Sequence, residues 1–219
     1  MYKYTEKFVA DLLFNENRIR IGTLNGFRDM EKRQGISDPL EGSYEDHVVI
    51  HGTDTDYREN HLFRENLKGF INIDSNANVQ NIKFINCSSQ TKRVSPNFLI
   101  FCSAHTKSFE VMEQFDNADS CFHIHKPETF FQLITFALEK EFEGKVNFLG
   151  VHKVNYNSYL RKRSALDSKP IHPALAKTED FIPQCEVRAI WEIPQHLITK
   201  PFYDLQIFGL RRFCRLIQV

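Results

Sequence analysis

One stretch near the end of the chain constrains the fold more than any other, because apolar and polar residues alternate along it. The apolar positions are Cys185, Val187, Ala189, Trp191 and Ile193. The polar positions are Gln184, Glu186, Arg188 and Glu192. Alternate residues of a β-strand share one face. The pattern therefore predicts a strand with an apolar face toward the core and a polar face that could line a cleft.

The other segments predict a mixed architecture. Tyr2–Tyr4 is a short strand candidate, and Thr5 can cap an amphipathic helix behind it. The apolar run Phe98–Cys102 is typical of a buried central strand. A helix is predicted from Pro127 to Gly144, because its apolar residues fall on one helical face. We expect one α+β domain over residues 1–219, rich in strands and with a few helices.

Some expectations concern less regular segments. Residues 67–73 and 79–85 predict two strands joined by a hairpin loop at 74–78. Residues 88–96 are expected to form a mobile connection, and residues 159–166 a helix or turn.

Composition limits the partners and the location. Lys plus Arg equals Asp plus Glu at 28 each, so net charge provides no long-range attraction to nucleic acid or to an acidic membrane. The five cysteines are dispersed without a Cys-x-x-Cys pair, which fits a reducing compartment. The sequence shows neither a signal peptide nor a membrane-spanning run. A cytoplasmic protein that does not associate with membranes is expected.

Two motifs could form sites. His123 and His125 would share one strand face and could hold a metal, but a metal site needs a third or fourth ligand. No metal is therefore expected. Cys102 and His105 could pair as nucleophile and base, although neighbours three apart at a strand end need not meet. The structural interpretation of that strand end is preferred.

Several dispersed segments together resemble a widespread microbial family of unknown function. They are Tyr2-Lys-Tyr4, Arg18–Arg28, Ser37-Asp-Pro-Leu-Glu41 and Gln184-Cys-Glu-Val-Arg188. Members of that family are common in mobile elements and phage-defence neighbourhoods. The resemblance implies an effector or toxin role.

The same segments are more distantly similar to ADP-ribosyltransferases, and that resemblance implies a split sheet with NAD as substrate. Glu186 would be the catalytic carboxylate that stabilises positive charge developing on the ribose. The implied cofactor-binding residues are Gln184, Arg188, Ser103 and either Arg20 or, less favoured, Arg28, whose guanidinium would bind the pyrophosphate. Tyr2 or Lys3 could instead occupy the first position of the family motif.

Two functions from different classes follow. The first is an NAD-dependent ADP-ribosyltransferase or NAD glycohydrolase that acts on a protein or nucleic-acid acceptor. The second is a non-catalytic module that binds a nucleotide or a protein partner, in which Glu186 and Arg188 pair for structural reasons. The sequence does not indicate an oligomeric state.

Overall fold

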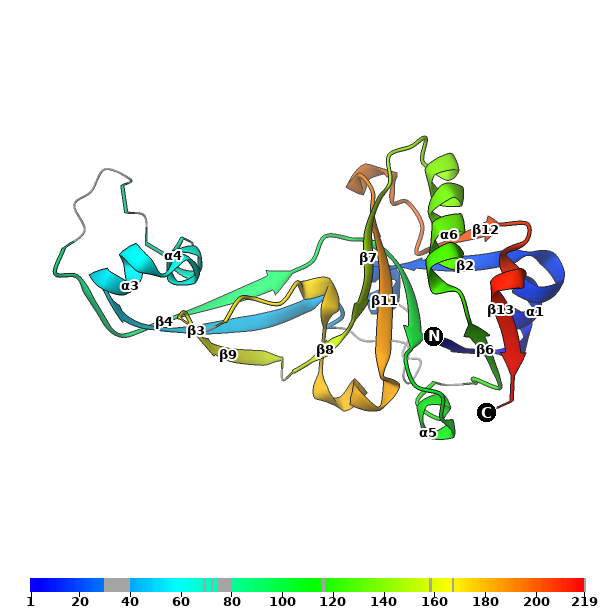
Figure 1. Cartoon of the computed structure of the whole chain (residues 1–219), viewed down its shortest axis with the longest axis horizontal. Coiled ribbons are helices and arrows are strands. Elements are labelled where there is room, and N and C mark those ends of the chain that lie inside the picture. Colours follow the sequence, from blue (N-terminus) through cyan, green and yellow to red (C-terminus); the bar gives the residue numbers. More distant parts are fainter. Residues whose placement is uncertain are drawn as a thin grey trace.

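The α+β class is confirmed by the computed structural model, which describes residues 1–29, 40–68, 70–71, 73–74, 80–115, 117–157, 159–166 and 168–218. Figure 1 shows a body built around a large antiparallel sheet and a long arm that projects from it. Both termini lie in the body.

Within the described residues, eight strands form the sheet of the body. They are β1 (Tyr2–Thr5), β2 (Arg18–Thr23), β5 (Leu99–Ala104), β6 (Ser120–Ile124), β7 (Asn147–Lys153), β11 (Glu186–Glu192), β12 (Phe202–Gln206) and β13 (Cys214–Ile217). The predicted apolar strand at 98–102 is β5, and it lies at the centre of the sheet. On one edge β5 pairs with β11 along its whole length. β7 pairs with the other edge of β11, and every residue of β11 except Glu192 is buried, so both faces of that strand are covered.

The sheet divides along the second edge of β5. Leu99 and Ile100 pair there with β2, whereas Ala104 pairs with Tyr2 of β1. Between these points, at residues 101–103, the edge of β5 has no paired strand among the described residues. One branch continues as β2 and β12, and the other as β1, β6 and β13. The structure therefore has a split sheet.

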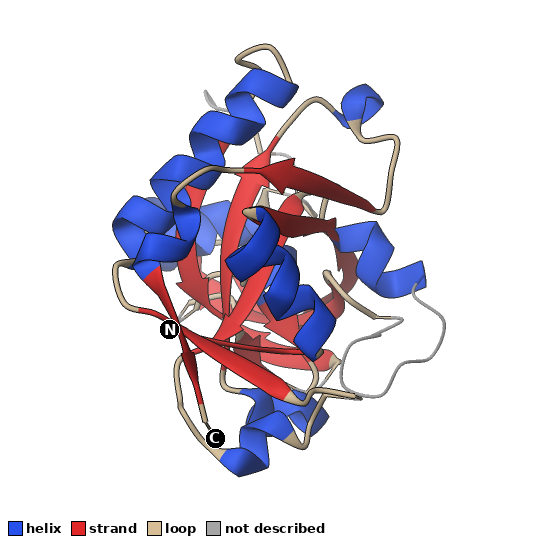
Figure 2. Ribbon diagram, turned by 90° about the vertical axis from the view of Figure 1, so that its right-hand side faces the viewer, coloured by secondary structure: helices blue, strands red, loops and turns tan. Residues whose placement is uncertain are grey.

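Helices cover the strands of the body from outside (Figure 2). The longest are α1 (Lys7–Glu16), which contacts β2 and β6, and α6 (Pro127–Glu141). Four α6 side chains enter the main core, namely Phe130, Phe131, Ile134 and Leu138. Trp191 of β11 is fully buried in that core, and its indole N–H donates to Thr135 Oγ1 at 2.8 Å. The expected helix at 127–144 is thus present and ends three residues earlier.

The arm is a three-stranded sheet with two short helices. Its strands are β3 (Ser43–Thr53), β4 (Lys83–Val94) and β9 (Leu160–Ser164), in the order β4-β3-β9. Helices α3 (Asp54–Glu59) and α4 (His61–Leu67) lie at its far end (Figure 1). Phe63 and Leu67 of α4 pack with Val48, Ile50, Phe84 and Ala165 in a small core of their own.

The remaining elements are short. They are α2 (Leu24–Asp29), α5 (Phe109–Met112), β8 (Asn155–Tyr156), β10 (Ala176–Lys177) and the 3₁₀ turns η1 (Pro173–Leu175), η2 (Glu179–Gln184), η3 (Gln195–Leu197) and η4 (Leu210–Phe213). β10 pairs with β8 beside the start of β11.

Four local predictions were wrong. The segment expected as a strand at 67–73 begins with the last residue of α4, and the connection expected at 88–96 is largely β4. β9 replaces the helix or turn expected at 159–166, because parallel pairing with β3 outweighs local preference there. The N-cap of α1 is Glu6 and not Thr5. Residues 75–79 of the expected hairpin loop lie outside the described residues.

Candidate functional site

A buried group of four charged side chains lies where β11 begins. Glu186 receives a hydrogen bond from Arg188 Nε at 2.7 Å and another from Lys177 Nζ at 2.9 Å, one on each carboxylate oxygen. Arg188 Nη1 is also 2.6 Å from Glu41 Oε1 and donates to the carbonyl of Ala174 at 2.7 Å. We call Glu41, Lys177, Glu186 and Arg188 the ion network.

The ion network is almost inaccessible to solvent, with Arg188 at 0% and Glu186 at 5% exposure. Burial alone would raise the pKa of Glu186, but Arg188 and Lys177 outweigh it and hold that pKa well below its usual value. For Glu41 the balance is reversed, since burial raises its pKa despite Arg188 and Lys177. Burial would lower the pKa of Arg188, yet Glu186 and Glu41 keep it above its usual value. Glu186 is therefore ionised at neutral pH.

Gln184 reaches the ion network from a turn and not from the strand. It ends η2, and Cys185 follows in a left-handed conformation with φ of 48°, so the predicted alternation begins only at Glu186. The Gln184 side-chain oxygen nevertheless accepts a hydrogen bond from Lys177 Nζ at 2.8 Å. The backbone N–H of Glu186 donates to Tyr156 Oη at 2.7 Å, which fixes the start of the strand.

Arg28 holds the segment that carries Glu41. Its guanidinium donates to the backbone carbonyl of Glu41 and, at 3.3 Å, to that of Gly42. It also donates to Asn25 Oδ1 at 3.1 Å, within α2. Gly42 has φ of +67°, a conformation that favours glycine. Arg28 thus positions Glu41, although its own side chain does not line either pocket described below.

A small pocket of about 130 Å³ opens onto the ion network. Its wall includes Lys3 of β1, Ser103 of β5 and Glu186 of β11, together with Glu41 and Lys177. The Ser103 hydroxyl donates to the Val187 carbonyl at 3.2 Å, so this serine is tied to the neighbouring strand. Three strands that are far apart in sequence therefore contribute polar groups to one cavity.

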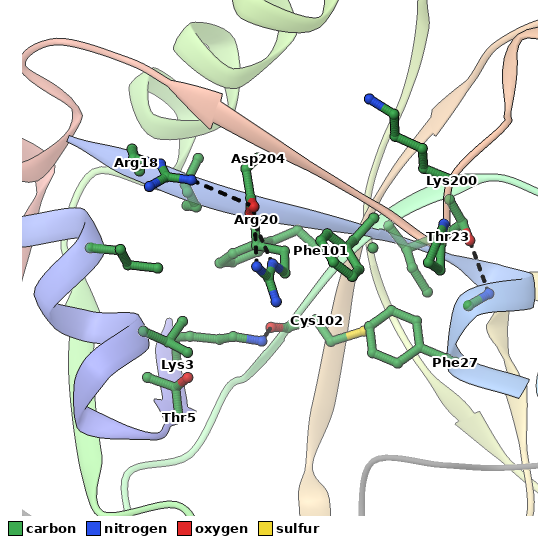
Figure 3. Close-up of a pocket in the computed structure, with 18 of the residues that line it drawn as sticks. Lys3, Thr5, Arg18, Arg20, Thr23, Phe27, Phe101, Cys102, Lys200 and Asp204 are labelled. Atoms are coloured by element: carbon green, nitrogen blue, oxygen red, sulfur yellow. Dashed lines mark hydrogen bonds and ion pairs between the residues drawn. The ribbon is translucent and has the colours of Figure 1, made fainter. Parts of the chain in front are cut away.

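A much larger pocket of about 680 Å³ occupies the split in the sheet (Figure 3). Its lining is mostly apolar and comes from α1, β2, β5 and the segment before β12. Four basic side chains also line it, Lys3, Arg18, Arg20 and Lys200, against two acidic ones, Glu6 and Asp204. The two pockets share wall residues, namely Lys3, Thr5, Glu6, Phe27 and Cys102. They are neighbours around Lys3.

Arg20 belongs to the large pocket and not to the ion network. It forms a two-point ion pair with Asp204, at 2.9 and 3.1 Å, between the paired strands β2 and β12. Its guanidinium carbon lies 3.9 Å from the centroid of the Phe202 ring. Figure 3 shows the Arg20 side chain directed into the pocket, above Cys102 and facing Lys3.

The structure therefore gathers part of the expected set. Glu186 and Arg188 belong to the ion network, and Gln184 contacts it. Ser103 lines the adjacent small pocket, and Arg20 lines the large pocket. Arg28 does not reach either pocket but holds the backbone of Glu41. Sequence reasoning missed Lys177, which no motif surrounds, and gave Glu41 no role although it closes the quoted Ser37–Glu41 segment. Residues 37–39 of that segment lie outside the described residues.

The histidine pair is placed elsewhere. His123 stacks on Tyr2 with ring centroids 4.9 Å apart, and the His123 and His125 centroids are 6.4 Å apart. Within the described part of the chain, no group of three or more histidine, cysteine or acidic residues is arranged to hold a metal ion. In the same part, no helix is both long and apolar enough to cross a membrane.

Comparison with known proteins adds no relative: no family model, no curated protein and no solved structure matches this chain.

Proposed function

We propose that this chain binds a nucleotide-class small molecule in the two neighbouring pockets at the split of its main sheet. The observation that carries the proposal is the large pocket, whose volume of about 680 Å³ is within the range of about 300–1,000 Å³ typical of small-molecule sites. Apolar walls suit a base, and fork-shaped or point cations suit phosphate groups. The excess of basic over acidic side chains in the lining favours an anionic ligand.

Aromatic side chains at this pocket support the same ligand class. Phe8 and Phe202 line it and remain 55% and 40% exposed, although each is a large apolar group. Exposed aromatic rings next to basic groups are the combination on which nucleobases stack. The Arg20 guanidinium lies over the Phe202 ring, so this pair joins an aromatic ring and a cation at the pocket.

Calorimetric titration with NAD, ADP-ribose and ATP tests the proposal. We expect at least one of them to bind, and Val9→Trp to weaken that binding because Val9 lines the pocket and tryptophan would fill part of it. Phe136→Trp is the matched control, since Phe136 is 57% exposed on α6 and away from both pockets. Absence of binding by all three compounds, or equal effects of the two substitutions, would refute the proposal.

A second candidate is cleavage of NAD by Glu186, as in ADP-ribosyltransferases. It is favoured by one observation: Lys3, Ser103 and Glu186 come from three strands and line one pocket. Breaking the bond to nicotinamide develops positive charge on the ribose, and an ionised carboxylate stabilises that charge. Against this, both Glu186 oxygens already accept hydrogen bonds from cationic groups, which offset its charge. Binding without cleavage is thus the better supported function.

Release of nicotinamide from NAD separates the two candidates. The catalytic candidate requires turnover by the wild type that Glu186→Gln abolishes. Glu192→Gln is the control, because Glu192 is exposed at the far end of the same strand. NAD binding without release leaves only the binding function, and turnover that survives Glu186→Gln excludes this carboxylate as the catalytic group.

A further inference from the structure

Lys3 occupies the gap in the sheet between the two pockets. It is the second residue of β1, and its Nζ donates to the backbone carbonyl of Cys102 at 2.8 Å, where the edge of β5 lacks a paired strand. Nζ also lies 5.0 Å from the centroid of the Phe101 ring. Lys3 is half-buried and lines both pockets, so its amine is next to cavity space.

The surroundings of Lys3 differ from those of Lys177, which is buried. Lys177 has Glu186 at 2.9 Å and Gln184 at 2.8 Å. In the described chain, no carboxylate lies within 4.0 Å of Lys3 Nζ, and the acceptor it reaches is an uncharged carbonyl. Loss of hydration without a direct counter-ion favours the neutral amine. In agreement, burial lowers the pKa of Lys3, although Cys102 and Glu186 act to raise it.

Other charged groups face the same space and set the local field. In the large pocket these are Glu6, Arg18, Arg20, Lys200 and Asp204, and in the small pocket they are Glu6, Glu41, Lys177 and Glu186. Glu186 and Glu41 are committed to Arg188 and Lys177 in the ion network. Arg188 and Lys177 therefore compensate most of the negative charge of Glu186 and Glu41 that would otherwise act on the Lys3 amine.

We propose that Lys3 is a reactive amine that forms an imine with carbonyl compounds entering the large pocket. The amine nitrogen bonds to the carbonyl carbon, the C=O bond breaks, and the carbonyl oxygen leaves with the two amine hydrogens as water. The neutral amine is the form that this step requires, and a half-buried lysine beside an apolar pocket, with no carboxylate of the described chain within ion-pair distance, releases its proton more readily than a surface lysine. The apolar lining and the basic side chains select aldehydes or ketones that carry an apolar body and an anionic group.

Reductive trapping with pyridoxal 5′-phosphate tests this proposal on the intact chain. This probe is an aromatic aldehyde with a phosphate group, and borohydride reduces its imine to a stable secondary amine. We expect peptide mapping by mass spectrometry at a low ratio of probe to protein to find more label on Lys3 than on Lys200 and Lys7 together. Lys200 lines the same pocket but is exposed, and the Lys7 side chain is 71% exposed. Fragment spectra separate Lys3 from the Met1 amine.

Lys3→Arg should remove the principal label and leave labelling of Met1 and Lys200 unchanged, with folding checked by urea denaturation. Peptide mapping of the wild-type chain shows whether the label prefers Lys3 even if Lys3→Arg does not fold. Label that prefers Lys200 would show that the pocket concentrates the probe while Lys3 is an ordinary ammonium, and label spread evenly over surface lysines would equally overturn the proposal. Labelling of Lys3 does not require nucleotide binding. Failure of the imine proposal can therefore be distinguished from failure of the proposed nucleotide-binding function.

Discussion

Replacing Arg188 by methionine tests whether the ion network is a unit that the fold depends on. The guanidinium contacts Glu186 at 2.7 Å, Glu41 at 2.6 Å and the carbonyl of Ala174 at 2.7 Å, in a site with 0% exposure. Methionine fills a similar volume but leaves two buried carboxylates with Lys177 as their shared cation. Removing one partner from a buried pair costs about 3–5 kcal/mol.

We expect Arg188→Met to lower the free energy of unfolding by about 3–5 kcal/mol, measured by urea denaturation with the fluorescence of Trp191, the single tryptophan. Arg20→Met is the matched control, because Arg20 also forms a two-point pair but its side chain is 42% exposed. An exposed pair contributes about 0–1 kcal/mol. Equal losses in the two variants would refute the reasoning.

Lowering the pH provides a second test with the same substitution. In the wild type, Arg188 and Lys177 hold the pKa of Glu186 below its unfolded value, so this contribution to stability is present above the unfolded pKa and is lost as the pH falls through the folded pKa. Without Arg188, burial dominates and raises the carboxylate pKa values, so protonation relieves the variant as the pH falls. The difference in the free energy of unfolding between Arg188→Met and the wild type should therefore become smaller as the pH falls from 7 to about 5. A difference that grows would contradict the account.

Three further changes test other parts of the structure. Trp191→Ala should lower the free energy of unfolding by about 3–5 kcal/mol because the indole is fully buried, whereas Phe136→Ala on the surface should change it by less than about 0.5 kcal/mol in urea denaturation. Thr53→Ala removes the side chain that caps α3 in a capping box with Asp56, so the arm should lose about 1 kcal/mol of local stability, seen as faster amide exchange in α3; unchanged exchange would argue against the cap. Glu186→Gln should flatten the acid limb of stability against pH, because it removes the group whose low pKa creates that limb; an unaltered limb would assign it to other carboxylates.

Local patterns predicted the elements whose apolar residues follow a simple order along the chain. The helix of α6 follows from its apolar stripe, and β5 from a continuous apolar run. The late strand was also predicted, with one apolar face toward the core and one polar face that could line a cleft. β11 is instead paired on both edges and buried on both faces, so its polar row is an internal network.

The site could be predicted only in part, because its charges are brought together by contacts distant in sequence. Glu186 and Arg188 share one strand face by simple alternation, which sequence reasoning can identify. Lys177 enters through the short strand β10, and Glu41 comes from the segment before β3, so neither position is defined by a local period. The left-handed turn at Cys185 takes Gln184 out of the strand and was not predicted.

The split of the sheet decides which early residue faces the pockets. The sequence did not decide between Tyr2 and Lys3, since the side chain of either residue could have pointed toward the pockets. In the structure Tyr2 stacks on His123, while Lys3 reaches Cys102 across the gap in the edge of β5. The choice depends on the pairing register of β1 with β5 and β6, which a short strand does not specify by itself.

A crystal structure of the protein soaked with NAD tests the central claim most directly. We predict ligand density in the gap between β1 and β2, with the phosphates near the basic side chains of Arg20 or Lys200. Density confined to another surface, or an unchanged pocket at a ligand concentration that saturates binding in solution, would contradict the assignment of this cavity as the binding site.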